Sequence, residues 1–244
     1  MKSFLLMITF LTRLPIKVKL KFTERDFIKG IKYLPIVGLV IGILLWAVSQ
    51  INHLIDRAVT VLFVWMFYIW ITGGLHIDGL ADSFDGIFSN RNKEKILDIM
   101  KDSRIGTFGV IGIIFVILLN IVLSYFIDFK VLLIIPVLGR SCGILSCAIN
   151  TYARKDKGMG KTFVEYSNFK NAIFVILITI IITIMFFDYM LAFSEILIFL
   201  YALLLGIYFK KKIGGMTGDT IGAVIELSQT FSLLLFYLLR GLIF

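Results

Sequence analysis

Seven stretches of this sequence are long enough and apolar enough to cross a lipid bilayer, and they limit the fold more than any other feature. They cover residues 33–55, 58–75, 105–127, 131–153, 171–187, 189–209 and 220–239. A spanning helix needs about 20 predominantly apolar residues. Because the apolar residues run continuously and do not alternate, a membrane β-barrel is disfavoured. We therefore expect an all-α, polytopic helical bundle in which residues 1–244 form a single membrane-embedded domain.

The composition supports a membrane protein. Apolar residues make up 59% of the chain and charged residues 17%, whereas a soluble domain has roughly 45–50% and about 25%. A soluble enzyme and a secreted disulfide scaffold are thereby excluded. Cys142 and Cys147 lie in one apolar stretch, and two cysteines are too few for a disulfide framework or a zinc site. The apolar part of the N-terminal segment, residues 3–16, is too short to span and predicts an interfacial or re-entrant helix.

Basic residues predict the orientation in the membrane. Lys and Arg concentrate in four segments, 1–32, 76–104, 154–170 and 210–212, whereas the intervening connections and the C-terminus hold only Arg57, Lys130 and Arg240. The positive-inside rule then places the N-terminus in the cytoplasm and the C-terminus outside. The same rule accounts for the net charge of +9, so no nucleic-acid partner is needed. Most polar residues that could do chemistry lie in the basic connections, and we expect the active site to face the cytoplasm.

The densest group of acidic residues follows the second apolar stretch. In segment 73–86, Asp78, Asp82 and Asp85 stand at positions i, i+4 and i+7, which lie within about 60° of one another around a helix. Like charges on one helix face repel, but a divalent cation such as Mg²⁺ reverses this energy and is commonly shared between carboxylates and substrate phosphates. The alternative is a solvated acidic face. His76 lies on the opposite side of an ideal helix from Asp78.

A second polar segment enters the third apolar stretch. Lys101, Ser103 and Arg104 precede the apolar run in segment 101–109. Basic side chains and free backbone N–H groups at a helix N-terminus bind phosphate. The same residues also fit helix capping and the positive-inside rule, so both interpretations stay open.

The third polar segment, 214–226, carries Asp219 and Glu226 at i and i+7, with Thr217 and Gly218 before them. Small residues here let another helix or a ligand approach closely. Glu226 lies two turns inside an apolar stretch, where ionisable residues are expensive and usually functional.

Arg140 is a second ionisable residue inside an apolar stretch. Its guanidinium could bind phosphate through two N–H groups or form an ion pair with Glu226 or Glu195. We interpret Glu195, near the outer end of its stretch, as interfacial.

Two classes of function fit these residues. Carboxylates on two helices with a metal between them and nearby Arg and Lys side chains suit an enzyme that acts on a phosphate anhydride. A secondary transporter would use Arg140 and Glu226 as substrate or proton sites, but it predicts internal repeats. No convincing repeat relates the two halves of the chain, and the enzyme is favoured.

Four motifs extend this interpretation. The sequences FLTRLP at 10–15, GGLHIDGLADSFDGIFS at 73–89, KDSRIGTFG at 101–109 and GGMTGDTIGAVIEL at 214–227 resemble, in this order, those of the cobalamin synthase family, adenosylcobinamide-GDP ribazoletransferase. A shorter likeness, Asp-Gly-x-x-Ala with spaced aspartates, links the chain to CDP-alcohol phosphotransferases of lipid synthesis. Those enzymes carry Arg after the Ala, where this chain has Asp82. Gln229 stands near a position where the cobalamin synthase family often has an acid, and we do not assign it to a metal.

The resemblance implies a Mg²⁺-dependent transferase in the inner membrane of a prokaryote. Its substrates would be adenosylcobinamide-GDP and α-ribazole or α-ribazole 5′-phosphate, and its products adenosylcobalamin or its 5′-phosphate and GMP. The implied metal ligands are Asp78, Asp82, Asp85, Asp219 and Glu226. The implied catalytic residues are Asp82, Asp85, Arg104 and Arg140, and the implied substrate-binding residues are His76, Lys101, Ser103, Thr217 and Gly218. The sequence leaves the oligomeric state open, and a homo-oligomer is compatible with it.

Overall fold

The computed structural model describes residues 1–16, 23–155, 158–187 and 189–243, so residues 17–22 of the predicted N-terminal segment lie outside it. The α-helices are α1 (Lys2–Leu11), α2 (Glu24–Gly30), α3 (Leu34–Ser49), α4 (Arg57–Thr72), α5 (Leu75–Phe88), α6 (Lys93–Ile99), α7 (Thr107–Phe126), α8 (Ile135–Ala148), α9 (Met159–Tyr166), α10 (Phe169–Phe186), α11 (Tyr189–Ile213) and α12 (Gly218–Ile243). Three short 3₁₀ helices join them, η1 (Ile31–Tyr33), η2 (Gln50–His53) and η3 (Phe129–Leu133).

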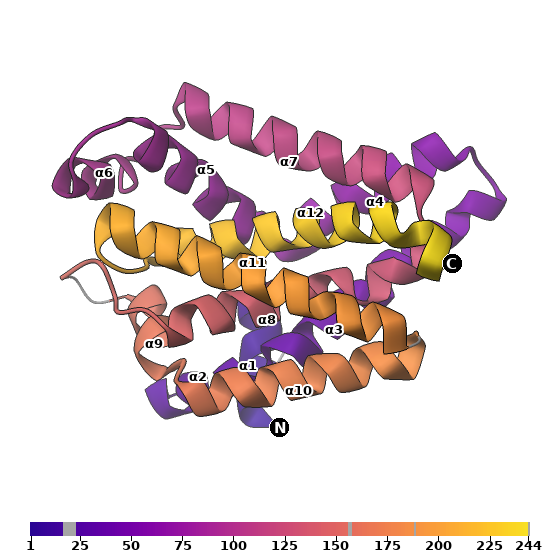
Figure 1. The fold of residues 1–244 in the computed structure, drawn as a ribbon, viewed down its shortest axis with the longest axis horizontal. Helices are drawn as coiled ribbons and strands as arrows, with labels where there is room; N and C mark the ends of the chain where they lie inside the picture. Colours follow the sequence, from indigo (N-terminus) through magenta and orange to yellow (C-terminus); the bar gives the residue numbers. More distant parts are fainter. Residues whose placement is uncertain (17–22, 156–157, 188, 244) are drawn as a thin grey trace.

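The long helices run side by side along the longest axis of the molecule (Figure 1). Helices α7, α10, α11 and α12, and the helical segment Glu24–His53, are each long and apolar enough to cross a membrane. Large apolar side chains point outward from them: Phe115, Met185 and Phe193 are all more than half exposed. Among the described residues, Arg140, Glu195 and Glu226 are buried inside the bundle. The polytopic helical class predicted from the sequence is confirmed.

The number of spans differs from the sequence-based count. Five described helices have the length and composition to span, and the bent pair α4–α5 raises this to six. The predicted span 131–153 divides into η3 and α8, and α8 has only 14 residues. The seven spans therefore stay a prediction.

The predicted span 58–75 ends at a sharp break. Helices α4 and α5 meet at an angle of 90°, and the two residues between them, Gly73 and Gly74, have φ values of 66° and 71°. Glycine adopts this left-handed conformation at little cost because it has no Cβ. Near the break, the Arg13 backbone N–H donates to Ile71 O at 2.7 Å, which connects the segment after α1 to the end of α4. The break directs α5, which carries the acidic residues, toward α12 and α7.

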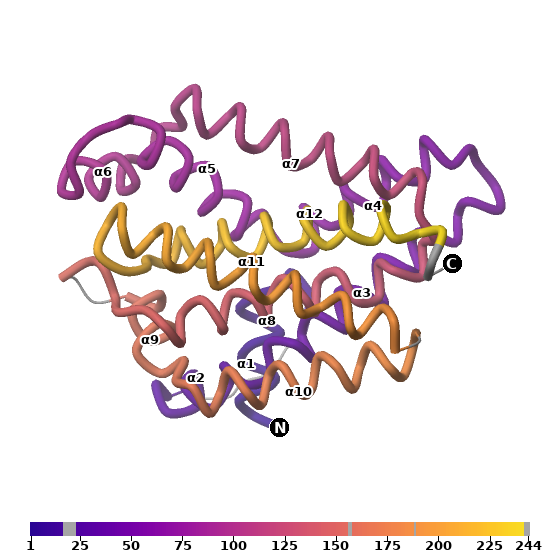
Figure 2. Tube along the Cα trace, viewed as in Figure 1, coloured from indigo at the N-terminus to yellow at the C-terminus, as the bar shows by residue number. Residues whose placement is uncertain are grey.

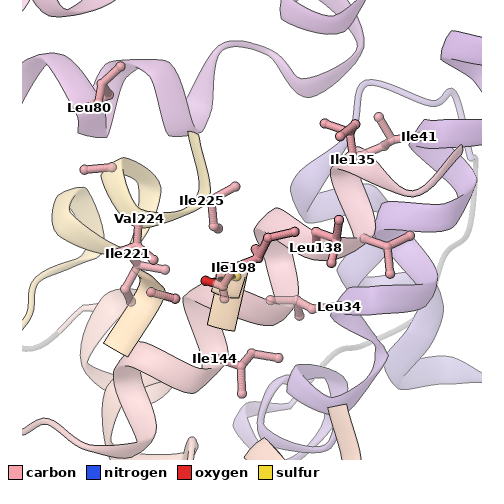
Figure 3. Close-up of a cluster of buried hydrophobic side chains, with 14 of the residues drawn as sticks. Leu34, Ile41, Leu80, Ile135, Leu138, Ile144, Ile198, Ile221, Val224 and Ile225 are labelled. Atoms are coloured by element: carbon pink, nitrogen blue, oxygen red, sulfur yellow. Dashed lines mark hydrogen bonds between the residues drawn. The ribbon is translucent and has the colours of Figure 1, made fainter. Parts of the chain in front are cut away.

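Helix α8 forms the centre of the bundle, and residues 135–147 are all buried. Figure 3 shows Ile135, Leu138 and Ile144 of this helix among apolar side chains of α3, α11 and α12. Glycines allow the close crossings: a Cβ on Gly139 would lie 2.9 Å from Ile225 O of α12. Dense packing of this kind leaves Arg140 without solvent.

The basic connections gather at one end of the bundle. The tube in Figure 2 places α6, α9 and the turn between α11 and α12 at this end, and the end of α7 and the C-terminus at the other. The structure therefore agrees with the alternation of connections rich and poor in basic residues. No membrane is present, so the cytoplasmic assignment of the basic end stays a prediction.

Candidate active site

A cavity of about 180 Å³ opens between α1, α5, α9 and α12. Asp78, His76 and Asp219 provide its acidic and polar wall, and Gly218 of the sequence-predicted set also lines it. The apolar wall consists of Phe10, Leu11, Leu34, Leu75, Met159, Phe163, Ile221 and Ile225. Residues of two polar segments identified in the sequence, 73–86 and 214–226, thus line the same cavity.

Glycines bring the two acidic helices together. A Cβ on Gly79 of α5 would lie 2.9 Å from Asp219 Cα of α12, and a Cβ on Gly222 would lie 2.9 Å from His76 O. This close approach explains why Asp78 and Asp219 reach the same cavity. Asp82, one turn along α5, is half-buried and interacts electrostatically with Asp219 and Asp78. The three aspartates form what we call the acidic group.

Arg154 is a site residue that the sequence interpretation missed. Its Nη2 lies 2.8 Å from Asp219 Oδ2, and it also donates to Met100 O at 3.3 Å. The backbone holds it there: the chain from Thr151 to Ala153 pairs with Met216 through two hydrogen bonds of 2.9 Å. In the sequence Arg154 is one of many basic residues in the connection 154–170, and nothing in its spacing marks its partner.

Thr217 directly precedes α12 and orients Asp219, the first acidic residue of that helix. The Thr217 and Thr220 side chains exchange hydrogen bonds with each other's backbone N–H groups at 3.2 and 2.8 Å, and Thr217 Oγ1 donates to Asp219 Oδ2 at 3.3 Å. Thr217 itself is fully buried, so its contact is with Asp219 and not with the cavity.

Asp85 lies apart from the acidic group. Its two carboxylate oxygens accept hydrogen bonds from the backbone N–H groups of Gly106 (2.7 Å) and Gly109 (2.8 Å). These are free N–H groups at the start of α7, which a carboxylate satisfies and stabilises. The three aspartates on this face of α5 therefore have different surroundings: Asp78 and Asp82 lie near Asp219 of α12, and Asp85 contacts the start of α7.

Glu226 lies in the interior of the bundle, behind the cavity. Tyr68 Oη donates to Glu226 Oε1 at 2.6 Å, and Gln229 Nε2 donates to Tyr68 Oη at 2.8 Å. His76 Nδ1 is 4.0 Å from the same Oε1. Tyr68 and Gln229 are thus interior partners that the sequence interpretation did not assign.

Arg140 is fully buried, and its Nη1 donates to Pro136 O at 3.1 Å. Among the described residues, its Nε and Nη2 atoms have no hydrogen-bond partner. The guanidinium interacts electrostatically with Glu226 and His76. Within the described residues, neither Glu226 nor Glu195 comes within ion-pair distance of Arg140, so neither of the predicted ion pairs forms.

The interpretation of Glu195 as interfacial is wrong. Its side chain is buried to 1% exposure and accepts a hydrogen bond from Thr183. Helices α10 and α11 pack against each other, and this packing covers the carboxylate.

Lys101, Ser103 and Arg104 are exposed and none of them lines the cavity. Arg104 donates to the carboxylate of Asp102 from Nε (3.0 Å) and Nη2 (2.6 Å). These hydrogen bonds lower the pKa of Asp102 to about 2. The segment 101–104 lies at the same end of the bundle as the cavity, outside its walls.

No three His, Cys, Asp or Glu side chains in the described part of the chain lie close enough to hold one metal ion between them. The structure divides the five predicted ligands: Asp78, Asp82 and Asp219 gather beside the cavity, Asp85 meets α7, and Glu226 meets Tyr68. Mg²⁺ is usually bound by one or two carboxylates together with substrate phosphates and water. The acidic group fits that kind of site.

Comparison of the sequence with known protein families assigns the chain to one of them. The sequence profile of cobalamin-5-phosphate synthase matches residues 3–237. The chain belongs to the cobalamin-5-phosphate synthase family. The resemblance expected from the four motifs is confirmed, and with it the prediction of a transferase.

Relatives of this synthase family match along their whole length. Adenosylcobinamide-GDP ribazoletransferase of Alkaliphilus oremlandii is 45% identical over 100% of both chains. The enzymes of the same name from Clostridium acetobutylicum and Acetivibrio thermocellus are 44% and 41% identical, over 97% and 98% of this chain and 96% and 99% of theirs. No solved structure gives a significant match.

Proposed function

We propose that this chain joins adenosylcobinamide-GDP to α-ribazole, or to α-ribazole 5′-phosphate, in the last steps of cobamide synthesis. A hydroxyl oxygen of the acceptor attacks the phosphorus attached to cobinamide and forms a new P–O bond. The bond from that phosphorus to the bridging oxygen breaks, GMP leaves with this oxygen, and the hydroxyl proton passes to solvent. The products are adenosylcobalamin, or its 5′-phosphate, and GMP.

The observation that carries this proposal is the meeting of acids from two helices at one cavity. Asp78 and Asp219 come from α5 and α12 and line the same wall, with Asp82 beside them. In phosphoryl transfer the protein mainly positions the reactants and compensates charge. An acidic group without a cation would repel a diphosphate, so the arrangement favours a bound divalent ion.

We propose that Mg²⁺ binds at the acidic group through one or two of the carboxylates of Asp78, Asp82 and Asp219, with substrate phosphate and water as its other ligands. When bound, the ion would neutralise charge on the diphosphate and on the leaving GMP. Asp85 is omitted because both of its carboxylate oxygens accept backbone hydrogen bonds from α7, and Glu226 is omitted because it lies behind the cavity and accepts from Tyr68. Five acids around one ion would also exceed what Mg²⁺ usually takes from a protein.

Residues around the acidic group would position the substrate and exclude water from the cavity. Arg154, held by Met100 O and Asp219, is the cation nearest to the acidic group and is suited to bind a phosphate oxygen. Phe10 and Phe163 form apolar walls, which favour an apolar part of a substrate and exclude water. We keep Lys101, Ser103 and Arg104 as proposed contacts for the nucleotide half outside the cavity.

We further propose that the enzyme lies in the cytoplasmic membrane with its cavity toward the cytoplasm. The apolar outer surface of the bundle supports the membrane location. The basic connections gather at the end where α5 and α9 meet the cavity (Figure 1), and basic connections favour the cytoplasmic side.

The test is GMP release by the purified full-length protein with adenosylcobinamide-GDP, α-ribazole and Mg²⁺. We expect Asp82→Asn to fold and to lose activity by about 100-fold or more, the usual cost of removing one electrostatic contact to a transition state. Asp98→Asn, an exposed residue of α6, is the matched control and should keep activity. Near-normal turnover by Asp82→Asn at saturating Mg²⁺ would contradict the acidic-group assignment. Turnover of a CDP-lipid with an alcohol acceptor, and none of adenosylcobinamide-GDP, would favour lipid synthesis instead.

A further inference from the structure

Five polar side chains from four helices meet behind the cavity, and we call them the interior group: Tyr68, His76, Arg140, Glu226 and Gln229. Each is buried to 8% exposure or less. Several of their atoms have no hydrogen-bond partner: His76 Nδ1, Arg140 Nε and Nη2, Glu226 Oε2 and Gln229 Oε1. Burying polar groups costs free energy, and a purely structural role would be served as well by apolar side chains. The interior group therefore calls for a function.

The hydrogen bonds of this group run in one direction, toward Glu226. Gln229 Nε2 donates to Tyr68 Oη, and Tyr68 Oη donates its own proton to Glu226 Oε1. Glu226 is thus an acceptor in this chain of hydrogen bonds. The nearby charge of Arg140 favours the ionised form of Glu226 in the interior of the bundle.

His76 connects the interior group to the cavity. Its Nδ1 is buried and lies 4.0 Å from Glu226 Oε1, while a tenth of its side chain remains exposed. The residue also lines the cavity beside Asp78 and Gly79. Nδ1 is thus the ring nitrogen near the carboxylate, and Nε2 is the remaining ring nitrogen of a side chain that lines the cavity.

We propose that Glu226 is a positioning residue that holds His76 in the tautomer with its proton on Nδ1, so that Nε2 accepts a hydrogen bond from a hydroxyl group of the substrate in the cavity. This deepens the proposed function and rests on it. In a neutral imidazole one nitrogen donates and the other accepts, and a hydrogen bond at one nitrogen decides the state of the other. In unliganded sites such hydrogen bonds are often long, and they tighten when the substrate binds.

The Nδ1–H tautomer of His76 also determines which kind of substrate group can bind to Nε2. A bare lone pair on Nε2 repels phosphate oxygens and other acceptors, and it attracts the O–H of a sugar. His76 lines the same cavity as Asp78 and Asp219. The hydroxyl acceptor would therefore be held beside the place where the diphosphate is expected. The ligand class is a hydroxyl-bearing acceptor, such as the ribose of α-ribazole.

Nitrogen-15 NMR of the full-length protein tests the tautomer without any turnover. The chain has only two histidines, His53 and His76, so labelling histidine and replacing His53 by Gln leaves a single imidazole to observe. We expect a protonated Nδ1 and an unprotonated Nε2. Glu226→Leu should move the signal toward the Nε2–H tautomer, and Glu226→Gln, whose amide oxygen still accepts, should preserve the Nδ1–H form.

An Nε2–H signal in the His53→Gln protein would overturn the proposal. So would an unchanged Nδ1–H signal in folded Glu226→Leu. If Glu226→Leu does not fold, Tyr68→Phe replaces it, because it removes the proton that Glu226 accepts from Tyr68 while keeping the ring. We then expect the carboxylate to turn toward Nδ1 and the Nδ1–H signal to persist, and an Nε2–H signal in this variant would also overturn the proposal.

Steady-state kinetics test the hydroxyl contact. We expect His76→Leu to raise KM for α-ribazole by about tenfold, which is about 1.4 kcal/mol, and to leave KM for adenosylcobinamide-GDP unchanged. His76→Gln, which keeps an acceptor at the end of the side chain, should recover part of the loss. Equal effects on both substrates would overturn the contact. A wild-type protein that releases no GMP would instead refute the proposed function, and the NMR result would stand by itself.

Discussion

At the scale of single residues, the three aspartates of α5 differ in what their carboxylates contact. Asp78 lines the cavity and Asp82 interacts with Asp219, whereas Asp85 accepts two backbone N–H groups of α7. Their spacing in the sequence is that of one helix face, which correctly predicts a shared direction. The spacing does not reveal that α7 begins within reach of the last of them, because that depends on how α5 and α7 pack.

Asp85 is therefore expected to affect stability more than chemistry. Replacing a capping side chain by Ala usually costs about 1 kcal/mol, and up to about 2. We expect Asp85→Ala to lower the unfolding free energy of the detergent-solubilised protein by this amount, and Asp85→Asn, which keeps one acceptor oxygen, to cost less. Activity per folded molecule should stay within a few-fold of wild type. A loss as large as that of Asp82→Asn, with unchanged stability, would return Asp85 to the catalytic set.

At the scale of helices, the site depends on the crossing of α5 and α12. Gly79 and Gly222 allow the two backbones to approach, and Asp78, His76 and Asp219 reach the cavity from either side of this contact. The sequence interpretation identified both segments and their small residues. It did not foresee the 90° break at Gly73 and Gly74, since hydropathy averages composition and ignores where the backbone turns.

The crossing can be tested with Gly79→Val. A Cβ at this position would lie 2.8 Å from Asp219 O and 2.9 Å from Asp219 Cα, and backbone atoms cannot move aside cheaply. Overpacking of this kind costs about 1–3 kcal/mol, and it would also move Asp219 away from Asp78. We expect lower thermal stability and loss of GMP release. Gly241→Val is the matched control, because a Cβ there meets nothing within 4 Å. Full activity in Gly79→Val would show that the two acids need not be held together.

At the scale of the whole molecule, the sequence predicted the class of fold and the grouping of charge better than it predicted interior contacts. Hydropathy and basic connections depend only on composition along the chain; the helical membrane class and the grouping of the basic connections agree with the structure, whereas five or six described segments have the length and composition to span and seven were predicted. Arg154 with Asp219 and Tyr68 with Glu226 are 65 and 158 residues apart, and no local pattern marks such pairs. Glu195 shows the same limit, because only the folded pair α10–α11 reveals that its carboxylate is covered.

The orientation of the molecule in the membrane is its most general untested property. The chain carries its basic connections at the end of the bundle that contains α6, α9 and the turn after α11, and its C-terminus lies at the other end (Figure 2). Two fusions to a reporter that is active only outside the cytoplasm test this: one after Lys212, before α12, and one after Phe244. Because α12 is long enough to span, we expect the first fusion to be inactive and the second to be active. Activity in the first fusion would place the basic end and its cavity outside the cytoplasm, where a cytoplasmic nucleotide-activated substrate could not reach the acidic group. Two inactive fusions would instead mean that α12 does not cross, and the odd number of spans predicted from the sequence would be wrong.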